Sequence, residues 1–398
     1  MDRGETGTSL AIFGRFFRFG LLAWGGPIAQ IAMLKRELVE EERWVSPSRF
    51  NRLLAVYQVL PGPEAHELCV HFGMLKGRRL GGFLAGFGFM LPGFVLILAL
   101  AVLYQRLDLT QPLLKALFLG VQLAVLALIV RAIHRIATHA LTSRALLAIA
   151  IASAGLTFAG ESFWIILPLA ALCGWGLSRR PRPGSAALAV AAVILLAAVA
   201  GHFNGSPPAN AASPRVHSGA ASAMDIFLSG LKAGLLTFGG AYTAIPFVRH
   251  DAVGRGWVTD GQFLDGLALS SVIPAPLIIF ATFVGYLAGG LAGALAMTAG
   301  IFLPAFAFGM LFYDQLERVI DDQRLHAALE GIAAAVVGVV AVTAVDLGRT
   351  LGGSVPAVIP AILLFAATLA VLYRSKSKWA VPAIMLGGAI AGGLAFGP

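Results

Sequence analysis

The stretch that decides the fold occurs twice, as Gly20-Leu-Leu-Ala-Trp-Gly-Gly-Pro27 and as Gly234-Leu-Leu-Thr-Phe-Gly-Gly-Ala241. Both copies lie inside apolar segments that are long enough to enter a bilayer. A Gly-Gly pair weakens a helix, because glycine loses more conformational freedom on folding than other residues. A bilayer supplies no water to pair with the backbone groups that such a break exposes. The two breaks therefore require a structural or functional reason.

The similarity between the two copies continues from Gly20 to Pro92 and from Gly234 to Pro304, with a nearly constant spacing between matched positions. Glycine, proline and tryptophan recur in the same order, which a composition rich in Gly, Ala and Leu does not explain by chance. We interpret the chain as a duplication. The matches are Trp44-Val45 with Trp257-Val258, Pro61-Gly62-Pro63 with Pro274-Ala275-Pro276, glycines 73, 77 and 81 with 285, 289 and 293, and Leu91-Pro92 with Leu303-Pro304.

Composition indicates a polytopic helical membrane protein. Of the 398 residues, 58% are hydrophobic and only 12% are charged, and the mean hydropathy is +0.83. Runs of about 20 apolar residues, the length of a membrane-spanning helix, recur along the chain. The formal charge of +9 comes from basic residues spread through short loops, without the basic stripe that nucleic acid requires. We therefore expect lipid around the protein and no nucleic-acid partner.

The expected architecture is all-α, with two repeats of six apolar segments and one extra segment. The N-terminal repeat with its extra segment covers residues 1–203, a Gly/Ser/Pro-rich linker covers 204–224, and the C-terminal repeat covers 225–398. The thirteen expected segments are 10–34, 50–75, 80–105, 112–133, 144–160, 162–178, 185–203, 226–247, 262–287, 290–313, 326–346, 354–373 and 378–397.

The odd number of segments before the linker would place the two repeats in opposite orientations. With the N-terminus inside, 19 Lys and Arg residues fall in cytoplasmic loops and 9 in outer ones, as the positive-inside rule favours, and the linker faces outward. The loop 35–52 is an exception, because its five basic residues would lie outside. They lie inside if the first two segments of each repeat are re-entrant hairpins, and the sequence leaves both schemes open.

Inverted repeats with helices broken at corresponding positions are typical of secondary transporters. In that plan the substrate site lies between the repeats near the membrane midplane, and the N-termini of half-helices present their positive ends to an anion. The alternative explanation is that glycine merely permits close helix packing and proline merely kinks a helix. Breaks that are present in both copies favour the transporter plan.

Four motifs of the first half resemble the signatures of the chromate ion transporter family, in its long-chain, two-domain form. They are Trp24-Gly25-Gly26-Pro27, Glu42-Arg43-Trp44-Val45, Leu60-Pro61-Gly62-Pro63-Glu64 and Leu91-Pro92-Gly93. The resemblance covers nearly the whole chain. It implies ion-gradient-driven export of chromate through the inner membrane, and hence chromate resistance.

The second copy departs from these motifs, and the resemblance therefore implies that the two halves differ in function. Ala241 replaces Pro27, Ala275 replaces Gly62, and Leu277 replaces Glu64.

A divalent anion inside a membrane needs compensating cations and hydrogen-bond donors. Arg18 and Lys232 occupy matched positions, each seven residues before the first glycine of its Gly-Gly pair, and together they could balance one dianion. The alternative is that both side chains extend to the membrane interface. The other candidate substrate-binding residues lie at or beside the breaks: Trp24, Gly25, Gly26, Pro27, Gln30, Tyr57, Gln58, Pro61, Gly62, Pro63, Thr237, Gly239, Gly240, Tyr242, Ser270 and Ser271.

Glu64 is the candidate coupling residue, because a carboxyl just past a broken helix could bind a proton during transport. The alternatives are a structural ion pair or a solvated carboxylate. The neighbouring His66-Glu67-Leu68-Cys69-Val70-His71 is one residue too long for a zinc-protease motif, since a separation of five residues turns His71 away from the face of His66. We expect no metal, no cofactor and no enzyme activity, because no phosphate loop or catalytic triad is recognisable.

The residues favour an anion substrate without identifying it. Chromate follows from the family resemblance, and sulfate or another tetrahedral oxyanion is the alternative within transport. A membrane scaffold or a membrane-embedded enzyme is the alternative from another class, although no cluster of catalytic residues supports it. The sequence leaves a homodimer open.

Overall fold

The computed structural model describes residues 9–58, 60–108, 111–177, 221–311 and 323–398, with the exception of residues 376 and 378. The predicted segment 185–203 and nearly all of the predicted linker lie outside these residues. The described part of the chain is helical, and its only β-structure is one isolated bridge. The all-α class that the sequence predicts is confirmed.

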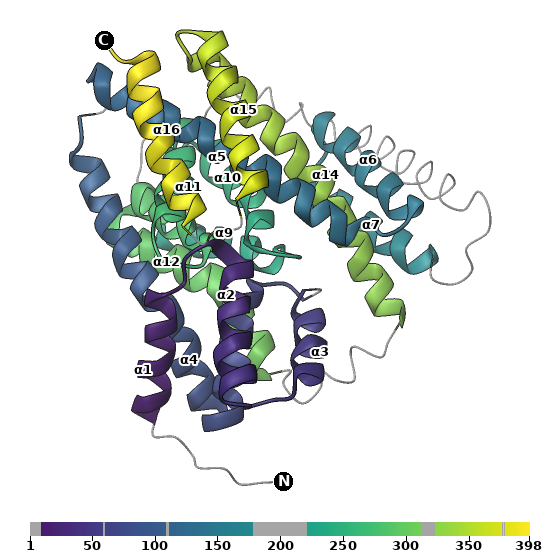
Figure 1. Ribbon diagram of the computed structural model, residues 1–398. Coiled ribbons are helices and arrows are strands. Elements are labelled where there is room, and N and C mark those ends of the chain that lie inside the picture. The colour runs from purple at the N-terminus through teal and green to yellow at the C-terminus, as the bar shows by residue number, and fades with distance from the viewer. Residues whose placement is uncertain are drawn as a thin grey trace.

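The described residues of the first half form seven α-helices and one π-helix, coloured purple to blue in Figure 1. They are α1 (Ser9–Leu21), α2 (Gly26–Leu34), the π-helix η1 (Lys35–Glu41), α3 (Pro47–Tyr57), α4 (Glu64–Arg106), α5 (Pro112–Ala140), α6 (Arg144–Phe158) and α7 (Phe163–Leu177).

The described residues of the second half form a similar series, coloured green to yellow (Figure 1). They are α9 (Ala223–Leu235), the 3-10 helix η3 (Ala241–Ala244), α10 (Ile245–Gly254), α11 (Asp260–Val272), the 3-10 helix η4 (Leu277–Ile279), α12 (Phe280–Leu311), α14 (Gln323–Ser354), α15 (Val358–Arg374) and α16 (Ala380–Phe396).

Helices end at the glycine pairs, as the sequence predicts. In the first half, Gly25 and Gly26 have φ angles of 88° and 76°, a left-handed conformation that favours glycine. In the second half, Gly239 and Gly240 have φ angles of 72° and 119°. A helix ends before each pair, and the next helix begins at Gly26 in the first half and, as a 3-10 helix, at Ala241 in the second. The predicted segments 10–34 and 226–247 are therefore each broken into separate helices.

The helices beside the breaks are too short to cross a membrane alone. The 13 residues of α1 and of α9 span about 20 Å at 1.5 Å per residue, whereas a bilayer core is about 30 Å thick. Four stretches of the described chain are long and apolar enough to cross: Glu64–Arg106, Pro112–Ala140, Leu277–Leu311 and Leu325–Ser354. The count of thirteen segments stays a prediction.

One long helix in each half, α4 in the first and α12 in the second, folds back on itself. In α4 the backbone leaves the helical region at Gly77 and Arg78, with φ angles of −138° and 51°, and in α12 it does so at Gly289 and Gly290, with φ angles of −152° and 62°. A side chain on Gly73 would collide with the carbonyl of Gly81, two positions that a straight helix would hold about 12 Å apart. Each helix is therefore a short limb and a long limb joined by a sharp reversal.

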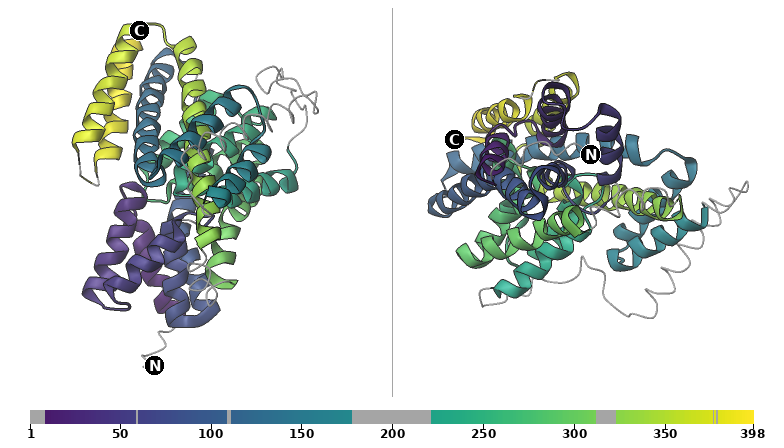
Figure 2. Two further views of the ribbon diagram at one scale, coloured as in Figure 1. Left: turned by 90° about the vertical axis from the view of Figure 1, so that its right-hand side faces the viewer. Right: turned by 90° about the horizontal axis from the view of Figure 1, so that it is seen from below.

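The two halves interlock through their long helices. Within each half, α1 packs against α4 and α9 packs against α12. Between the halves, α4 packs against α12, α5 packs against α15 and α16, and α14 packs against α6 and α7. The views in Figures 1 and 2 show α15 and α16 lying beside α5, although they belong to opposite halves of the chain.

Small residues allow these helices to approach closely. Gly120 on α5 lies against Gly388 and Gly392 on α16, and Gly331 on α14 lies against Ala170 and Gly174 on α7. In a membrane, where lipid is as apolar as leucine, such close packing is a principal force between helices.

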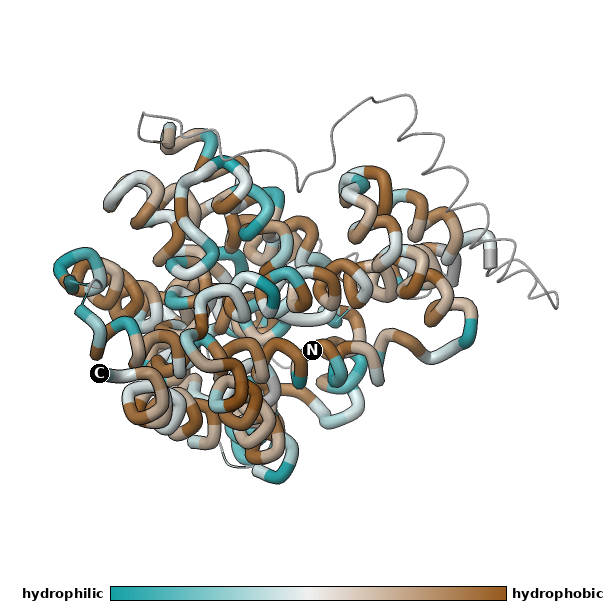
Figure 3. The backbone as a smooth tube through the Cα atoms, turned by 90° about the horizontal axis from the view of Figure 1, so that it is seen from above, coloured by the Kyte–Doolittle hydropathy of each residue, from teal (hydrophilic) through white to brown (hydrophobic). Residues whose placement is uncertain are grey.

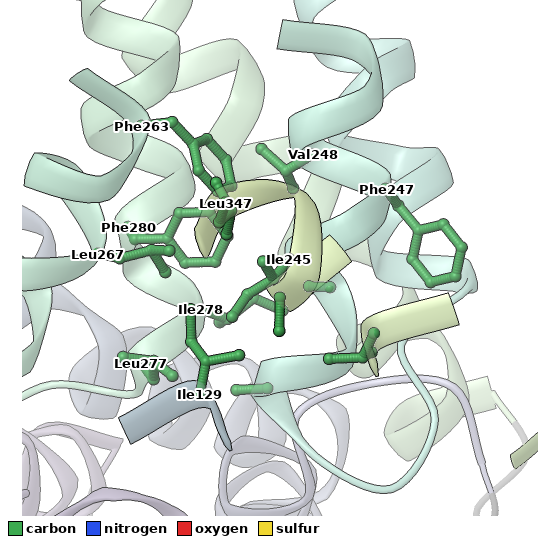
Figure 4. Close-up of a cluster of buried hydrophobic side chains, with 14 of the residues drawn as sticks. Ile129, Ile245, Phe247, Val248, Phe263, Leu267, Leu277, Ile278, Phe280 and Leu347 are labelled. Atoms are coloured by element: carbon green, nitrogen blue, oxygen red, sulfur yellow. The ribbon is translucent and has the colours of Figure 1, made fainter. Parts of the chain in front are cut away.

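Apolar side chains fill the interior and also cover the outside. Figure 4 shows the centre of the largest buried cluster, to which α5, α10, α11, η4, α12 and α14 contribute. In Figure 3 hydrophobic residues colour the outer helices as well. On α15 and α16, Ile359 is 73% exposed and Leu394 is 85% exposed. An outer surface of this kind suits lipid, so the fold is that of a multi-pass membrane protein.

The close packing of α5 against α16 predicts that adding one methyl group at Gly120 destabilises the protein. Gly120→Ala should lower the thermal unfolding temperature in detergent by several degrees, because the new Cβ would meet the Gly388 carbonyl and force the helices apart. Gly155→Ala on α6 is the matched control, since nothing lies within 4 Å of its Cβ position and alanine favours a helix. Equal stability of the two variants would contradict the close approach.

Candidate functional site

The broken segments of the two halves meet, and we call their first meeting point the first crossing. It joins residues 61–63 to residues 237–240. The N–H of Gly62 donates a hydrogen bond to the Thr237 carbonyl at 2.8 Å, and Pro61 pairs with Phe238 in an antiparallel bridge. The second break of the first half is therefore held by the first break of the second half.

A second crossing joins residues 23–30 to residues 274–276. The buried amide of Gln30 donates to the carbonyls of Ala23 and Ala275, at 3.0 Å each. Gly93 on the long limb of α4 also lies against Ala275. At the first crossing, Ala305 on the long limb of α12 lies 3.4 Å from the Cβ position of Gly62. The two crossings thus use corresponding segments in reciprocal roles.

Helices begin at both crossings. At the first crossing α4 begins at Glu64, and at the second α2 begins at Gly26. The first N–H groups of a helix have no partner inside it and carry the positive end of the helix dipole. This end of α4 therefore favours negative charge, whether from a side chain or from a bound anion.

Charged side chains gather at the first crossing. Glu64 is only 7% exposed, and its Oε1 atom lies 3.9 Å from the Cβ position of Gly240. Arg135 near the end of α5 interacts electrostatically with Glu64 and with Tyr242. Arg131, one turn earlier, also interacts with Tyr242. Arg135 is exposed and Arg131 is partly exposed, so the guanidinium of Arg135 is accessible to an anion.

Sequence reasoning missed Arg131 and Arg135 by counting them as loop charges. A signal was present, because a separation of four residues places both arginines on the same face of a helix. The structure extends α5 to Ala140, beyond the predicted end at residue 133, and so places Arg135 on the same helix as Arg131.

Arg18 and Lys232 lie elsewhere, each beside its own carboxylate. Arg18 is 61% exposed and approaches Glu37 at 3.4 Å, whereas Lys232 forms an ion pair with Asp251. The register that aligns Gly20 with Gly234 also aligns these two carboxylates, so the two pairs correspond. Neither cation stands free at a crossing. Their expected role in balancing a dianion therefore finds no geometric support, and its effect on transport stays a prediction.

The ion pair between Asp251 and Lys232 persists at neutral pH, because the Asp251 carboxyl stays ionised. This carboxyl lies on α10, outside the four candidate spans. Burial raises its pKa, but hydrogen bonds from His250 and Lys232 outweigh burial and lower the pKa to about 2. The carboxylate therefore stays charged at neutral pH and neutralises the lysine.

Most of the predicted neutral donors are already engaged. Gln30 and Tyr242 lie at the crossings, whereas Gln58 is exposed at the end of α3 and Trp24 packs on Trp379 with ring centroids 5.0 Å apart. The hydroxyl contacts are Thr237 to the Ala233 carbonyl (2.6 Å), Ser270 and Ser271 to the Leu267 carbonyl (2.8 and 2.7 Å) and Tyr57 to His71 (2.9 Å).

His66 and His71 have different neighbours, as their spacing predicts. His66 packs against Phe302 and Phe306 at ring-centroid distances of 4.9 and 4.8 Å, while His71 pairs with Tyr57. In the described residues no group of three or more His, Cys, Asp or Glu side chains is placed to hold a metal ion.

A buried polar network that no sequence motif indicated ties three helices together. Asp265 on α11 accepts one hydrogen bond from Tyr104 on α4 and one from Gln122 on α5, both at 2.7 Å. Both carboxylate oxygens therefore have a partner, and the network stabilises the frame.

Comparison with known proteins identifies the family. The family model described as "Chromate transporter" matches residues 10–175 and again residues 224–393. A chromate transport protein of Pseudomonas aeruginosa is 58% identical over 97% of this chain and 92% of its own length.

A chromate transport protein of Cupriavidus metallidurans is 29% identical over 96% of this chain and 92% of its own length. No solved structure matches. The family model covers most of both halves, and the motifs of the first half had predicted the same assignment. The chain therefore belongs to the chromate transporter family.

Proposed function

We propose that the chain is a secondary transporter that exports chromate from the cytoplasm across the inner membrane and so confers chromate resistance. The observation that carries this proposal is the first crossing, where broken segments of both halves meet beside Arg131, Arg135 and a buried carboxyl. Such a site suits an anion in a membrane, because helix ends and cations replace the water that the anion leaves behind. The names of the two relatives point to chromate as that anion.

We further propose that the chain contains two inverted repeats, one within residues 1–203, which also include one extra membrane segment, and one over residues 225–398. The reciprocal crossings, the matched ion pairs and the two matches of the family model support this arrangement. So do the reversals at 77–78 and 289–290, where the backbone adopts similar φ angles in both halves. Alternating access then consists of a movement of one repeat against the other around the crossings.

Transport of labelled chromate into everted membrane vesicles tests the function. Vesicles that contain the chain should accumulate chromate when an ion gradient is imposed, because everted vesicles turn export into uptake. Empty vesicles are the control. Excess sulfate, a dianion of similar shape, should compete only weakly if chromate is the substrate, whereas uptake of labelled sulfate in its place would contradict the assignment.

Arg135 provides a sharper test of the site. Arg135→Gln should raise the half-saturating chromate concentration about tenfold, which corresponds to about 1.4 kcal/mol of lost attraction. The double variant Arg18→Gln, Lys232→Gln should change it less, because both of those cations are paired with carboxylates. The opposite order of effects would restore the sequence-based assignment of Arg18 and Lys232 to the substrate.

Glu64→Gln tests coupling. Glutamine keeps the size and hydrogen-bonding capacity of the side chain but cannot titrate, so gradient-driven uptake into everted vesicles should be lost. Exchange of chromate for chromate should survive, because it needs no net proton movement. Leu277→Gln at the matched position of the second half is the control and should alter packing rather than coupling. Normal pH-dependent uptake by Glu64→Gln would contradict the coupling role.

A further inference from the structure

Glu67 is a buried carboxyl that neither the sequence motifs nor the proposed mechanism uses. Its residue is 0% exposed, and neither carboxyl oxygen has a hydrogen-bond partner in the described part of the chain. A buried carboxylate without a partner is costly, because it loses its hydration without compensation. A group of this kind in a membrane protein is by default a candidate for proton movement.

Glu67 lies directly beside Glu64. Both belong to the first turn of α4, where a separation of three residues places them on the same face, and the two carboxyls interact electrostatically. Two ionised carboxylates at this spacing repel each other in a site that excludes water. A proton held by the pair removes one of the two charges, and the positive end of α4 stabilises the other.

The carboxyl of Glu67 also contacts the first crossing. A Cβ atom on Gly62 would lie 2.7 Å from Glu67 Oε1, so the carboxyl rests against the backbone of Gly62. That same residue donates its N–H to Thr237 of the other half. A change of charge on Glu67 therefore acts on the segment that joins the two halves.

The second half lacks this device. The register that aligns Pro61 with Pro274 places Ala275 opposite Gly62 and Phe280 opposite Glu67. In the second half the carboxyl is replaced by the phenyl ring of Phe280, and the matched turn residue Ala275 has a Cβ atom. Gly62 leaves room for the carboxyl, and its φ angle of 150° also favours glycine.

We propose that Glu67 and Glu64 together bind one proton that is taken up with the anion, and that Glu67 transmits this binding to the first crossing through Gly62. This inference rests on the proposed transport function. Among the described residues, the other charged and titratable groups near the pair are Arg135, which interacts with Glu64, and Tyr242 and Arg131 beside Arg135. A dianion bound to the arginines favours the protonated pair, so anion and proton binding are positively linked.

The ligand is a proton rather than a metal ion. The two carboxyls stand without a third His, Cys, Asp or Glu placed to complete a metal site among the described residues. The carboxyl of Glu67 and the methyl group of Ala305 both lie against the Cβ position of Gly62. A sodium ion, which also prefers several oxygen ligands, is distinguished by the test.

Proton uptake on anion binding is the direct measurement. Chromate is added to the purified, detergent-solubilised full chain in weakly buffered solution with a pH indicator. We expect wild type to take up protons, Glu67→Gln and Glu64→Gln to take up fewer, and the double variant to take up none. Glu161→Gln, a carboxyl in the turn between α6 and α7, is the control and should match wild type. Varying sodium should leave the result unchanged.

Each outcome decides one point. Proton uptake by Glu67→Gln equal to that of wild type overturns the inference, as does a wild type that exchanges chromate without taking up protons or that requires sodium. A wild type that fails to transport chromate overturns the proposed function instead. If Glu67→Gln does not fold, Glu67→Asp is the substitute, because it keeps a titratable group and should take up protons with a shifted pH dependence. A Glu67→Asp variant that loses both proton uptake and its pH dependence overturns the inference.

Discussion

Backbone that leaves a helix inside a membrane must find its hydrogen bonds within the protein, because the hydrocarbon offers none. This constraint organises the whole molecule. The turn at Gly62 is completed by Thr237, and the turn at Ala275 is completed by Gln30. Each half therefore supplies the partners that the other half lacks. The breaks and the association of the halves are two aspects of the same requirement.

The long helices hold the crossings in place. The later helices of each half pack against the other half: α5 packs on α15 and α16, and α14 packs on α6 and α7. Gly120 and Gly331 allow these helices to approach until their backbones touch. The frame is held by extended packing, whereas the crossings are joined by few hydrogen bonds.

The frame is duplicated, but the chemistry is not. Both halves contain the glycine breaks, the reversal in the long helix and an ion pair beside the first break. Glu64 and Glu67 occur only in the first half, where the second half has Leu277 and Phe280. The arginines that accompany the carboxyls come from α5. The first crossing thus carries the charged side chains, whereas the second is held by the neutral amide of Gln30.

The sequence by itself determined the helical class, the places where helices break and the family. Gly25-Gly26 and Gly239-Gly240 end helices because glycine acts locally, through the freedom of its own backbone. Such signals are legible in a single sequence. The resemblance of the first-half motifs likewise needed no structure.

Only the tertiary structure decided which segments meet. The contact of Gly62 with Thr237, and the closeness of Arg135 to Glu64, depend on how helices far apart in the chain cross. Nor did spacing reveal that Arg18 faces the carboxylate of Glu37 on η1 and that Lys232 faces that of Asp251 on α10. A residue's type and spacing constrain its own helix, whereas its partners are set by the packing of helices whose separation in sequence carries no information about their distance in space.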